Sequence, residues 1–264
     1  MAKKSPPSNS NAIRESDVYR GRNTSMGALI VESERVFAAL ADGMSLEEVK
    51  IKCIDGSLLP QRAEQSRKRI WASLNHRYFS HQQDWVREDI VAAYRTSRAA
   101  FVDLLYIHFA LRDLLTFEFV TKVLFEGRNG TQRPIDKTEV RDLLDSASAS
   151  QDHIANWSES SRDKLSNSTL TALRDFELLV GKNKKHIGRR SISDFAAEHL
   201  LHVLTWEGER GRSVIEEPTW KLFFLDKNAV AAILARLAQN GRIRFEKAGS
   251  TVVLETPAGW ERAA

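Results

Sequence analysis

The residues best suited to contacting a nucleic acid lie on one face of the segment from Arg62 to Phe79. At 100° per residue this segment is an amphipathic helix, with an apolar face made of Ile70, Trp71, Leu74 and Tyr78. The opposite face carries polar side chains that can form hydrogen bonds with base edges: Arg62, Gln65, Arg69, Ser73 and His76. Lys68 and Arg77 fall toward the edges of that face, where DNA phosphates would lie. The pattern predicts a helix that enters the major groove, and a solvated basic helix face is the alternative.

A second basic region follows a helix that is predicted to begin at Ser158. The outer face of this helix carries Lys164 and Asn167. The stretch after it has five basic residues and no acidic one: Lys182, Lys184, Lys185, Arg189 and Arg190. Basic side chains in such a stretch anchor phosphates and release counterions from DNA. We expect a β-hairpin wing that follows the DNA backbone, and a flexible surface loop is the alternative.

The net charge of the chain hides these two regions. The 264 residues include 39 Lys and Arg against 35 Asp and Glu, a net charge of +4. The stretch from Arg62 to Arg77 alone carries +4 and the stretch from Lys182 to Arg190 carries +5, which leaves −5 on the rest of the chain. Concentrated basic regions on an acidic body are typical of a nucleic-acid-binding protein.

The sequence offers little for catalysis. It contains no P-loop, no nucleophile elbow and no His-Glu-x-x-His motif. His199 and His202 have the spacing of half a metal site, but no third ligand accompanies them, and Cys53 is the only cysteine. Glu48-Val49-Lys50 has the Glu-x-Lys order of metal-dependent nucleases, but it falls on a short helix instead of a central strand. We therefore expect a protein that is not an enzyme and that has no metal and no cofactor.

The elements that must position the first basic face are helices. A helix is predicted from Ala28 to Asp42, and Gly43 ends it. Ser45 and Glu48 form a capping box that starts a second, short helix. Together with the helix from Arg62, these segments suit a helix-turn-helix unit, and a small helical bundle without that function is the alternative.

The remaining segments predict a helical core and a second region. Two or three long apolar helices between Asp84 and Glu126 form the core, and charged residues interrupt them too often for a membrane span. The polar residues after Glu126 mark a boundary. We predict a disordered tail over residues 1–18, an N-terminal helical domain over 19–130 and a C-terminal winged-helix region over 131–264. No secretory signal is recognisable, so we expect a cytoplasmic protein with no membrane contact.

The C-terminal region shows the order of a winged helix most clearly. Helices are predicted over 194–206 and 227–240, with a short one near Glu216 between them. Two strands with a turn at Ala248-Gly249 follow as a hairpin. The fold class predicted is therefore mainly α, a helical bundle with a helix-turn-helix unit and one or two winged-helix units whose wings are small β-hairpins. For this last unit, DNA binding and protein docking remain equal alternatives.

Several segments resemble the BrxA family of BREX (bacteriophage exclusion) systems, which protect bacteria from phage. The similarity runs in order through Tyr19–Arg22, Gly27–Ile30, Glu32–Arg35, Gly43–Glu48 and Arg67–Ile70. Its most distinctive segment is Trp157–Leu165. The resemblance implies a helical, non-enzymatic DNA-binding accessory factor that acts beside an adenine methyltransferase, an ATPase and other BREX subunits. It also implies a helical core like that of NusB-type antitermination factors.

These observations predict a protein that binds double-stranded DNA through a basic helix and a basic wing. Two alternatives stay open. The protein can be an assembly module that docks onto other BREX subunits such as the methyltransferase or the ATPase, or it can be a NusB-like RNA-binding factor.

Overall fold

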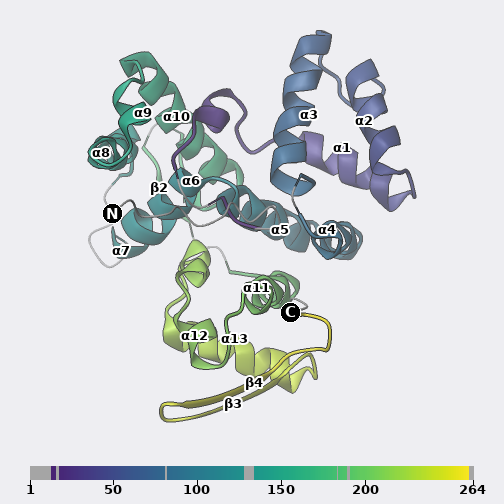
Figure 1. Ribbon diagram of the computed structural model, residues 1–264, viewed down its shortest axis with the longest axis vertical. Helices are drawn as coiled ribbons and strands as arrows, with labels where there is room; N and C mark the ends of the chain where they lie inside the picture. The colour runs from purple at the N-terminus through teal and green to yellow at the C-terminus, as the bar shows by residue number, and fades with distance from the viewer. Residues whose placement is uncertain are drawn as a thin grey trace, which may run out of the picture.

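Helices make up most of the computed structural model, which describes residues 13–15, 18–80, 82–127, 134–182, 184–188 and 191–261. Within these ranges the strands form two small antiparallel sheets of two strands each. The elements fall into three groups around the central helix α5 (Arg98–Leu111), as Figure 1 shows. The predicted fold class, a mainly helical bundle with small hairpins, is confirmed.

Helix α5 is central because it has no polar face. Every residue from Ala100 to Leu111 is buried. The helix packs against helices of the groups to its right and below it in Figure 1, and Tyr106 and Phe109 contact the ring of Phe176 in the remaining group. The apolar stretch continues through α6 (Leu114–Glu118), the π-helix η2 (Phe119–Leu124) and α7 (Phe125–Gly127). Among the described helices, none has both the length and the apolar character that a membrane crossing requires.

The first group holds the predicted helix-turn-helix segment. It contains η1 (Gly21–Ser25), α1 (Ile30–Ala41), α2 (Leu46–Asp55), α3 (Glu64–Tyr78) and α4 (Asp84–Thr96). The predicted capping box is confirmed, because the Ser45 N–H donates to Glu48 Oε2 at 2.8 Å and the Glu48 N–H donates to Ser45 Oγ at 3.3 Å. Arg67 ties α2 to α3, since its guanidinium donates to the carbonyl oxygens of Ile54, Gln61 and Arg62, each at 2.8 Å.

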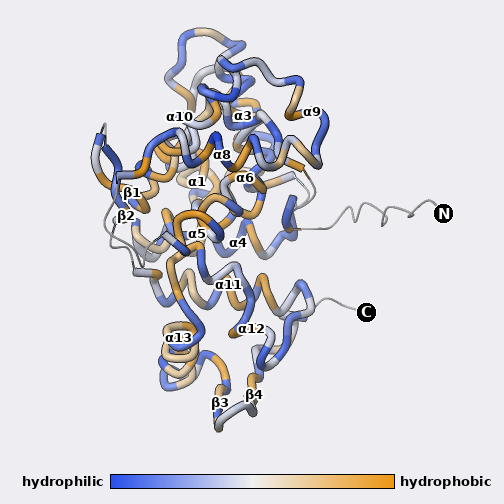
Figure 2. Tube along the Cα trace, turned by 90° about the vertical axis from the view of Figure 1, so that its left-hand side faces the viewer, coloured by the Kyte–Doolittle hydropathy of each residue, from blue (hydrophilic) through white to orange (hydrophobic). Residues whose placement is uncertain are grey.

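The second group consists of three helices and a hairpin. Its elements are α8 (Lys137–Ser148), α9 (Asp152–Ala155), α10 (Glu159–Asp175), β1 (Leu179–Val180) and β2 (His186–Ile187). The two strands pair Leu179 with Ile187 and Val180 with His186. Figure 2 shows this hairpin at one edge of the molecule, near the C-terminal end of α10.

The third group repeats that order with a longer hairpin. It contains α11 (Asp194–Trp206), α12 (Arg212–Glu216), η3 (Pro218–Phe223), α13 (Lys227–Gln239), β3 (Arg244–Ala248) and β4 (Thr251–Glu255). Asp226 caps α13 by accepting from the N–H groups of Asn228 and Ala229. The hairpin projects from the end of the molecule that is farthest from the first two groups (Figures 1 and 2).

The predicted N-terminal tail is too long. Ile13 is buried in the core, and the Glu15 N–H donates to the Leu111 carbonyl at 2.9 Å. Arg14 forms ion pairs with Glu207 and Glu217 of the third group. These contacts make residues 13–15 part of the folded body. The buried side chains of all three groups form one cluster, and the boundary between residues 130 and 131, which falls outside the described residues, stays a prediction.

Candidate nucleic-acid interface

The polar face of α3 is largely open to solvent, as its pattern predicts. Arg62, two residues before α3, and Gln65, Lys68 and Arg69 within it are exposed, while Ser73 and His76 are half-buried. Lys68 forms an i,i+4 ion pair with Glu64 at 2.6 Å. The face therefore presents its most exposed basic side chains near the N-terminus of α3 and reaches the body of the protein at His76.

Arg77 is wrongly predicted as a phosphate contact, because it is buried. Only 2% of the residue is exposed. Its guanidinium donates to the carbonyl oxygens of Gly27 and Ala28 at 2.9 and 3.1 Å and to Asn23 Oδ1 at 2.8 Å. It also stacks over the Phe109 ring, 4.6 Å from the ring centre. Arg77 satisfies buried carbonyl groups between η1 and α1 and so fixes the path of that segment across α3.

His76 joins α3 to the N-terminal segments. Arg22 Nη1 lies 2.7 Å from His76 Nδ1, and Glu15 Oε2 lies 2.9 Å from His76 Nε2. Burial and the nearby guanidinium groups of Arg22 and Arg112 lower the pKa of His76 to about 4. The imidazole is therefore neutral at pH 7, accepting a hydrogen bond from Arg22 and donating one to Glu15.

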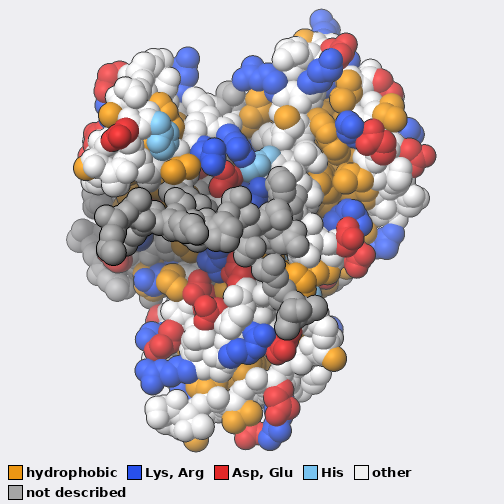
Figure 3. All heavy atoms as spheres, viewed as in Figure 1, with side chains coloured by type: hydrophobic (Ala, Val, Ile, Leu, Met, Phe, Trp, Pro, Cys, Tyr) orange, Lys and Arg blue, Asp and Glu red, His pale blue; other side chains and the backbone are white. Residues whose placement is uncertain are grey.

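Arg20 and Arg22 belong to the candidate interface although the helix-face argument does not include them. They lie just before and within η1, with side chains that are 48% and 49% exposed. A hollow lined by Glu15, Arg20, Arg22, His76 and Arg112 lies at this point. Figure 3 shows Lys and Arg side chains gathered between the first and second groups of helices. The Arg-Gly-Arg sequence at residues 20–22 is the only local signal that could have pointed to them.

Helix α10 holds η1 from the other side. The Ser168 hydroxyl donates to the Asn23 carbonyl at 2.5 Å. Just before η1, the Tyr19 N–H donates at 2.8 Å to Oε1 of Gln151, the residue that precedes α9. Lys164 lies one helical turn before Ser168, so it projects from the same side of α10. Lys164 and Asn167 are both exposed. The structure thus places the predicted polar face of α10 next to η1, which in turn contacts α3.

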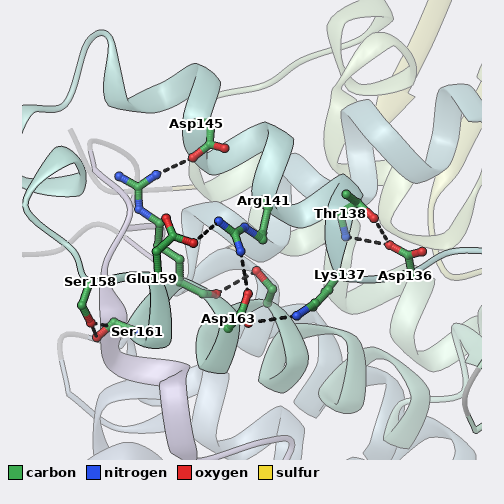
Figure 4. Close-up of polar contacts among 11 residues, drawn as sticks. Asp136, Lys137, Thr138, Arg141, Asp145, Ser158, Glu159, Ser161 and Asp163 are labelled. Atoms are coloured by element: carbon green, nitrogen blue, oxygen red, sulfur yellow. Dashed lines mark hydrogen bonds and ion pairs between the residues drawn. The ribbon is translucent and has the colours of Figure 1, made fainter.

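The segment Trp157–Leu165 orients α10 through ion pairs to α8 (Figure 4). Asp163 accepts from Lys137 at 2.9 Å and from Arg141 at 2.8 Å, and Arg141 also pairs with Glu159. The Ser158 hydroxyl caps the helix by accepting from the Ser161 N–H. Glu159 and Asp163 thus turn toward α8, whereas Lys164, on another side of the helix, is exposed.

The second basic region is a short hairpin, as predicted. Lys182 and Lys184 are exposed, and Lys185 is half-buried with its Nζ donating to the Lys182 carbonyl at 3.1 Å. Gly181 has φ of +99°, and a Cβ there would lie 2.2 Å from the Lys184 carbonyl oxygen, so the tight turn requires glycine. Arg189 and Arg190 lie outside the described residues.

The arginines of the third group and Lys227 are engaged by carboxylates of the same group. Arg212 and Lys227 both pair with Glu216, Arg236 pairs with Asp194, and Arg244 pairs with Glu246 and Glu255. These pairs offset the positive charge that a phosphate contact would use.

The histidines with metal-like spacing serve the core instead. His199 Nε2 lies 2.8 Å from His108 Nε2, and its Nδ1 lies 2.7 Å from Asp89 Oδ2. His202 stacks between the rings of Trp85 and Trp260, at centroid distances of 3.7 and 4.5 Å. Within the described part of the chain, no three His, Cys, Asp or Glu side chains are grouped to hold a metal ion.

Comparison with known proteins places the chain in a family. No curated protein matches it. A crystal structure of an uncharacterized protein from Magnetospirillum magneticum has a similar fold, with a TM-score of 0.59 at 14% sequence identity, and the match covers 78% of this chain and 97% of that one. The BrxA family matches residues 17–203, which is more than half of the chain. The protein therefore belongs to the BrxA family, whose members are components of BREX phage-defence systems.

Proposed function

We propose that this protein binds double-stranded DNA in the bacterial cytoplasm as a non-enzymatic accessory factor of a BREX system. One observation carries the proposal. The exposed polar face of α3 and the polar face of α10 lie on either side of η1, where Arg20 and Arg22 are half-exposed. Basic side chains of α3, η1 and α10 therefore lie near one another, and Arg20 and Arg22 border a hollow between them, an arrangement that suits a polyanionic ligand.

In this proposal α3 acts as the recognition helix of a helix-turn-helix unit with α2. Gln65, Arg69 and Ser73 face the base edges, where Arg and Gln form hydrogen bonds with guanine and adenine. Arg62, Lys68 and Lys164 contact phosphates, and so do the hairpin lysines Lys182 and Lys184 if the hairpin acts as a wing. Because most of these contacts reach phosphates, we expect binding that depends strongly on salt and weakly on sequence.

We further propose that the third group, a second winged-helix unit, docks onto another BREX subunit such as the methyltransferase or the ATPase. Its arginines already have carboxylate partners, which makes this unit a weaker DNA ligand than α3. Protein docking is a common use of the winged-helix order, and a mixed-charge surface suits a partner that is itself a protein.

RNA binding is less well supported. Modules that recognise single-stranded RNA stack its bases on exposed aromatic side chains. The large hydrophobic side chains that are well exposed in the described ranges are Val31, Ile51 and Val180, and none of them is aromatic.

The experiment that tests this proposal compares ligand classes and one variant. Fluorescence anisotropy with labelled duplex DNA, single-stranded DNA and structured RNA is measured for the wild type and for Arg62/Lys68/Arg69→Ala. We expect duplex DNA to bind most tightly and the variant to bind it at least tenfold more weakly at about 0.1 M salt, since each lost phosphate contact removes roughly 0.9 from the salt slope.

The control is Arg212/Arg242/Arg244→Ala, which removes the same charge from the third group. It is expected to bind duplex DNA like the wild type. Equal affinity of both variants for duplex DNA, or a preference of the wild type for RNA, would contradict the proposal.

A further inference from the structure

The carboxylate of Glu15 lies among nitrogen-bearing side chains from two segments, η1 and α3. Its oxygens contact Arg20 Nε, Arg22 Nη1 at 3.4 Å and His76 Nε2 at 2.9 Å. The Glu15 side chain is only 16% exposed, whereas the two arginines are about half exposed. Glu15 thus occupies the inner part of the hollow, and the arginines reach over it toward solvent.

The hollow remains positively charged in spite of Glu15. Four guanidinium groups line it, those of Arg20, Arg22, Arg77 and Arg112, together with the carboxyl groups of Glu15 and Asp113. Burial raises the pKa of Asp113, and the guanidinium groups help to hold the pKa of His76 down to about 4. The position of Glu15 therefore favours a singly charged anionic group, either a carboxylate or a phosphodiester.

A DNA phosphate fits that position by its chemistry and its location. Guanidinium groups bind carboxylates and phosphates through the same hydrogen-bond geometry, so a carboxylate can occupy a phosphate site. The hollow lies between η1, the C-terminal end of α3 and the end of α5, next to the α3 face that the proposed duplex follows. We propose that Arg20, Arg22 and His76 form a phosphate site for the DNA backbone, and that Glu15 fills it in the free protein and must leave before DNA binds. This inference rests on the proposed function.

Glu15 can leave without unfolding the segment that carries it. Its backbone N–H is held by the Leu111 carbonyl, Arg14 is paired with Glu207 and Glu217, and Ile13 is buried. Rotation of the Glu15 side chain alone vacates the site. The contact of Glu15 with Arg20 and Arg22 is therefore autoinhibitory. It stabilises the two arginines in the free protein and lowers the affinity for DNA.

The test is Glu15→Gln, which keeps the size of the side chain and removes its charge. We expect the variant to bind duplex DNA about five- to tenfold more tightly than the wild type at about 0.1 M salt. One added phosphate contact steepens the salt slope by about 0.9, which corresponds to roughly eightfold between 1 M and 0.1 M salt.

Two further variants separate the site from a general charge effect. Glu246→Gln removes one negative charge from a Glu–Arg pair in β3 and is expected to leave the affinity unchanged. Arg22→Ala is expected to weaken binding and to abolish most of the gain from Glu15→Gln in the double variant. Because the Arg22 side chain is half-exposed, we expect Arg22→Ala to fold. The comparison of single and double variants therefore does not depend on the stability of Glu15→Gln alone. In a separate arm, inorganic phosphate is added to the protein–DNA complex at matched ionic strength. A site specific for the DNA backbone leaves the affinity for DNA unchanged, whereas a site for free phosphate lowers it by competition.

The outcomes are distinct. If the wild type binds duplex DNA through α3 but Glu15→Gln binds it no more tightly, or if Arg22→Ala leaves the gain intact, the phosphate site is refuted and the proposed function stands. If neither the wild type nor Glu15→Gln binds duplex DNA, both fail. Binding that appears only in Glu15→Gln supports both.

Discussion

Replacing Arg77 with Ala tests whether this residue is an internal anchor or a DNA contact. The substitution removes three hydrogen bonds from a guanidinium group, to Gly27, Ala28 and Asn23, and the stacking on Phe109. Hydrogen bonds from charged donors contribute about 1.5–3 kcal/mol each. Burial lowers the pKa of Arg77, so the desolvation of its charge offsets part of that gain, and we expect a net loss of about 3 kcal/mol in the free energy of unfolding.

Urea denaturation followed by circular dichroism measures this loss. With a urea dependence of about 3 kcal/mol per M, the midpoint is expected to fall by about 1 M. Arg77→Lys keeps the charge but donates from a single nitrogen atom. Its urea midpoint should therefore lie between those of the wild type and Arg77→Ala. If Arg77→Ala unfolds like the wild type and instead loses affinity for duplex DNA, the assignment of Arg77 to the interior is wrong and the helix-face prediction is right.

Two further predictions concern the hairpin and the buried histidines. Gly181→Ala is expected to lower the melting temperature, because its Cβ would clash with the Lys184 carbonyl and because the positive φ of residue 181 disfavours Ala. Gly127→Ala is the control and should leave the melting temperature unchanged, since no atom lies within 4 Å of the added Cβ. Equal melting temperatures of the two variants would refute the tight turn. Burial and the neighbouring His199 hold the pKa of His108 well below its ordinary value of 6.5, so the unfolded chain takes up a proton that the folded one excludes. The free energy of unfolding should therefore decrease as the pH falls below about 6.5, by up to about 1.4 kcal/mol per pH unit for that proton, and His108→Gln should show a flatter dependence in urea titrations at several pH values.

Helix caps, turns and helix faces could be predicted where they depend on residues that are close together in the sequence. The Ser45–Glu48 capping box, the hairpin turn at Ala248-Gly249 and the amphipathic α3 each depend on residues a few positions apart. Such short-range patterns determine caps, turns and helix faces whatever surrounds them.

The errors arise where partners lie far apart in the sequence. Arg77 is buried because Asn23, Gly27 and Ala28 cross over α3, about 50 residues away, and helical periodicity contains no information on that crossing. Arg67, which helical periodicity places on the apolar side of α3, has a related explanation, since it donates to the Ile54 carbonyl at the end of α2 and to carbonyl groups of the loop before α3. A charged residue at the edge of a helix face is exposed or buried according to what packs on it.

In the candidate site, too, the local features could be predicted and the contacts between distant residues could not. The polar face of α3 could be read from the sequence, but its alignment with Arg20, Arg22 and Lys164 depends on contacts such as Ser168 to Asn23, which join residues 145 positions apart. The role of Trp157–Leu165 is also visible only in the fold, where Asp163 and Glu159 bind Arg141 of α8.

The central claim is that the α3 face and the adjoining arginines bind the DNA backbone. The most direct test is the slope of log affinity against log salt concentration for duplex DNA, measured for the wild type and for Arg62/Lys68/Arg69→Ala. The account predicts a strongly negative slope for the wild type and a slope shallower by about 2 for the variant, roughly 0.9 for each of the two lost phosphate contacts, those of Arg62 and Lys68. A slope that is the same in both proteins, or a wild type whose affinity does not depend on salt, would contradict it.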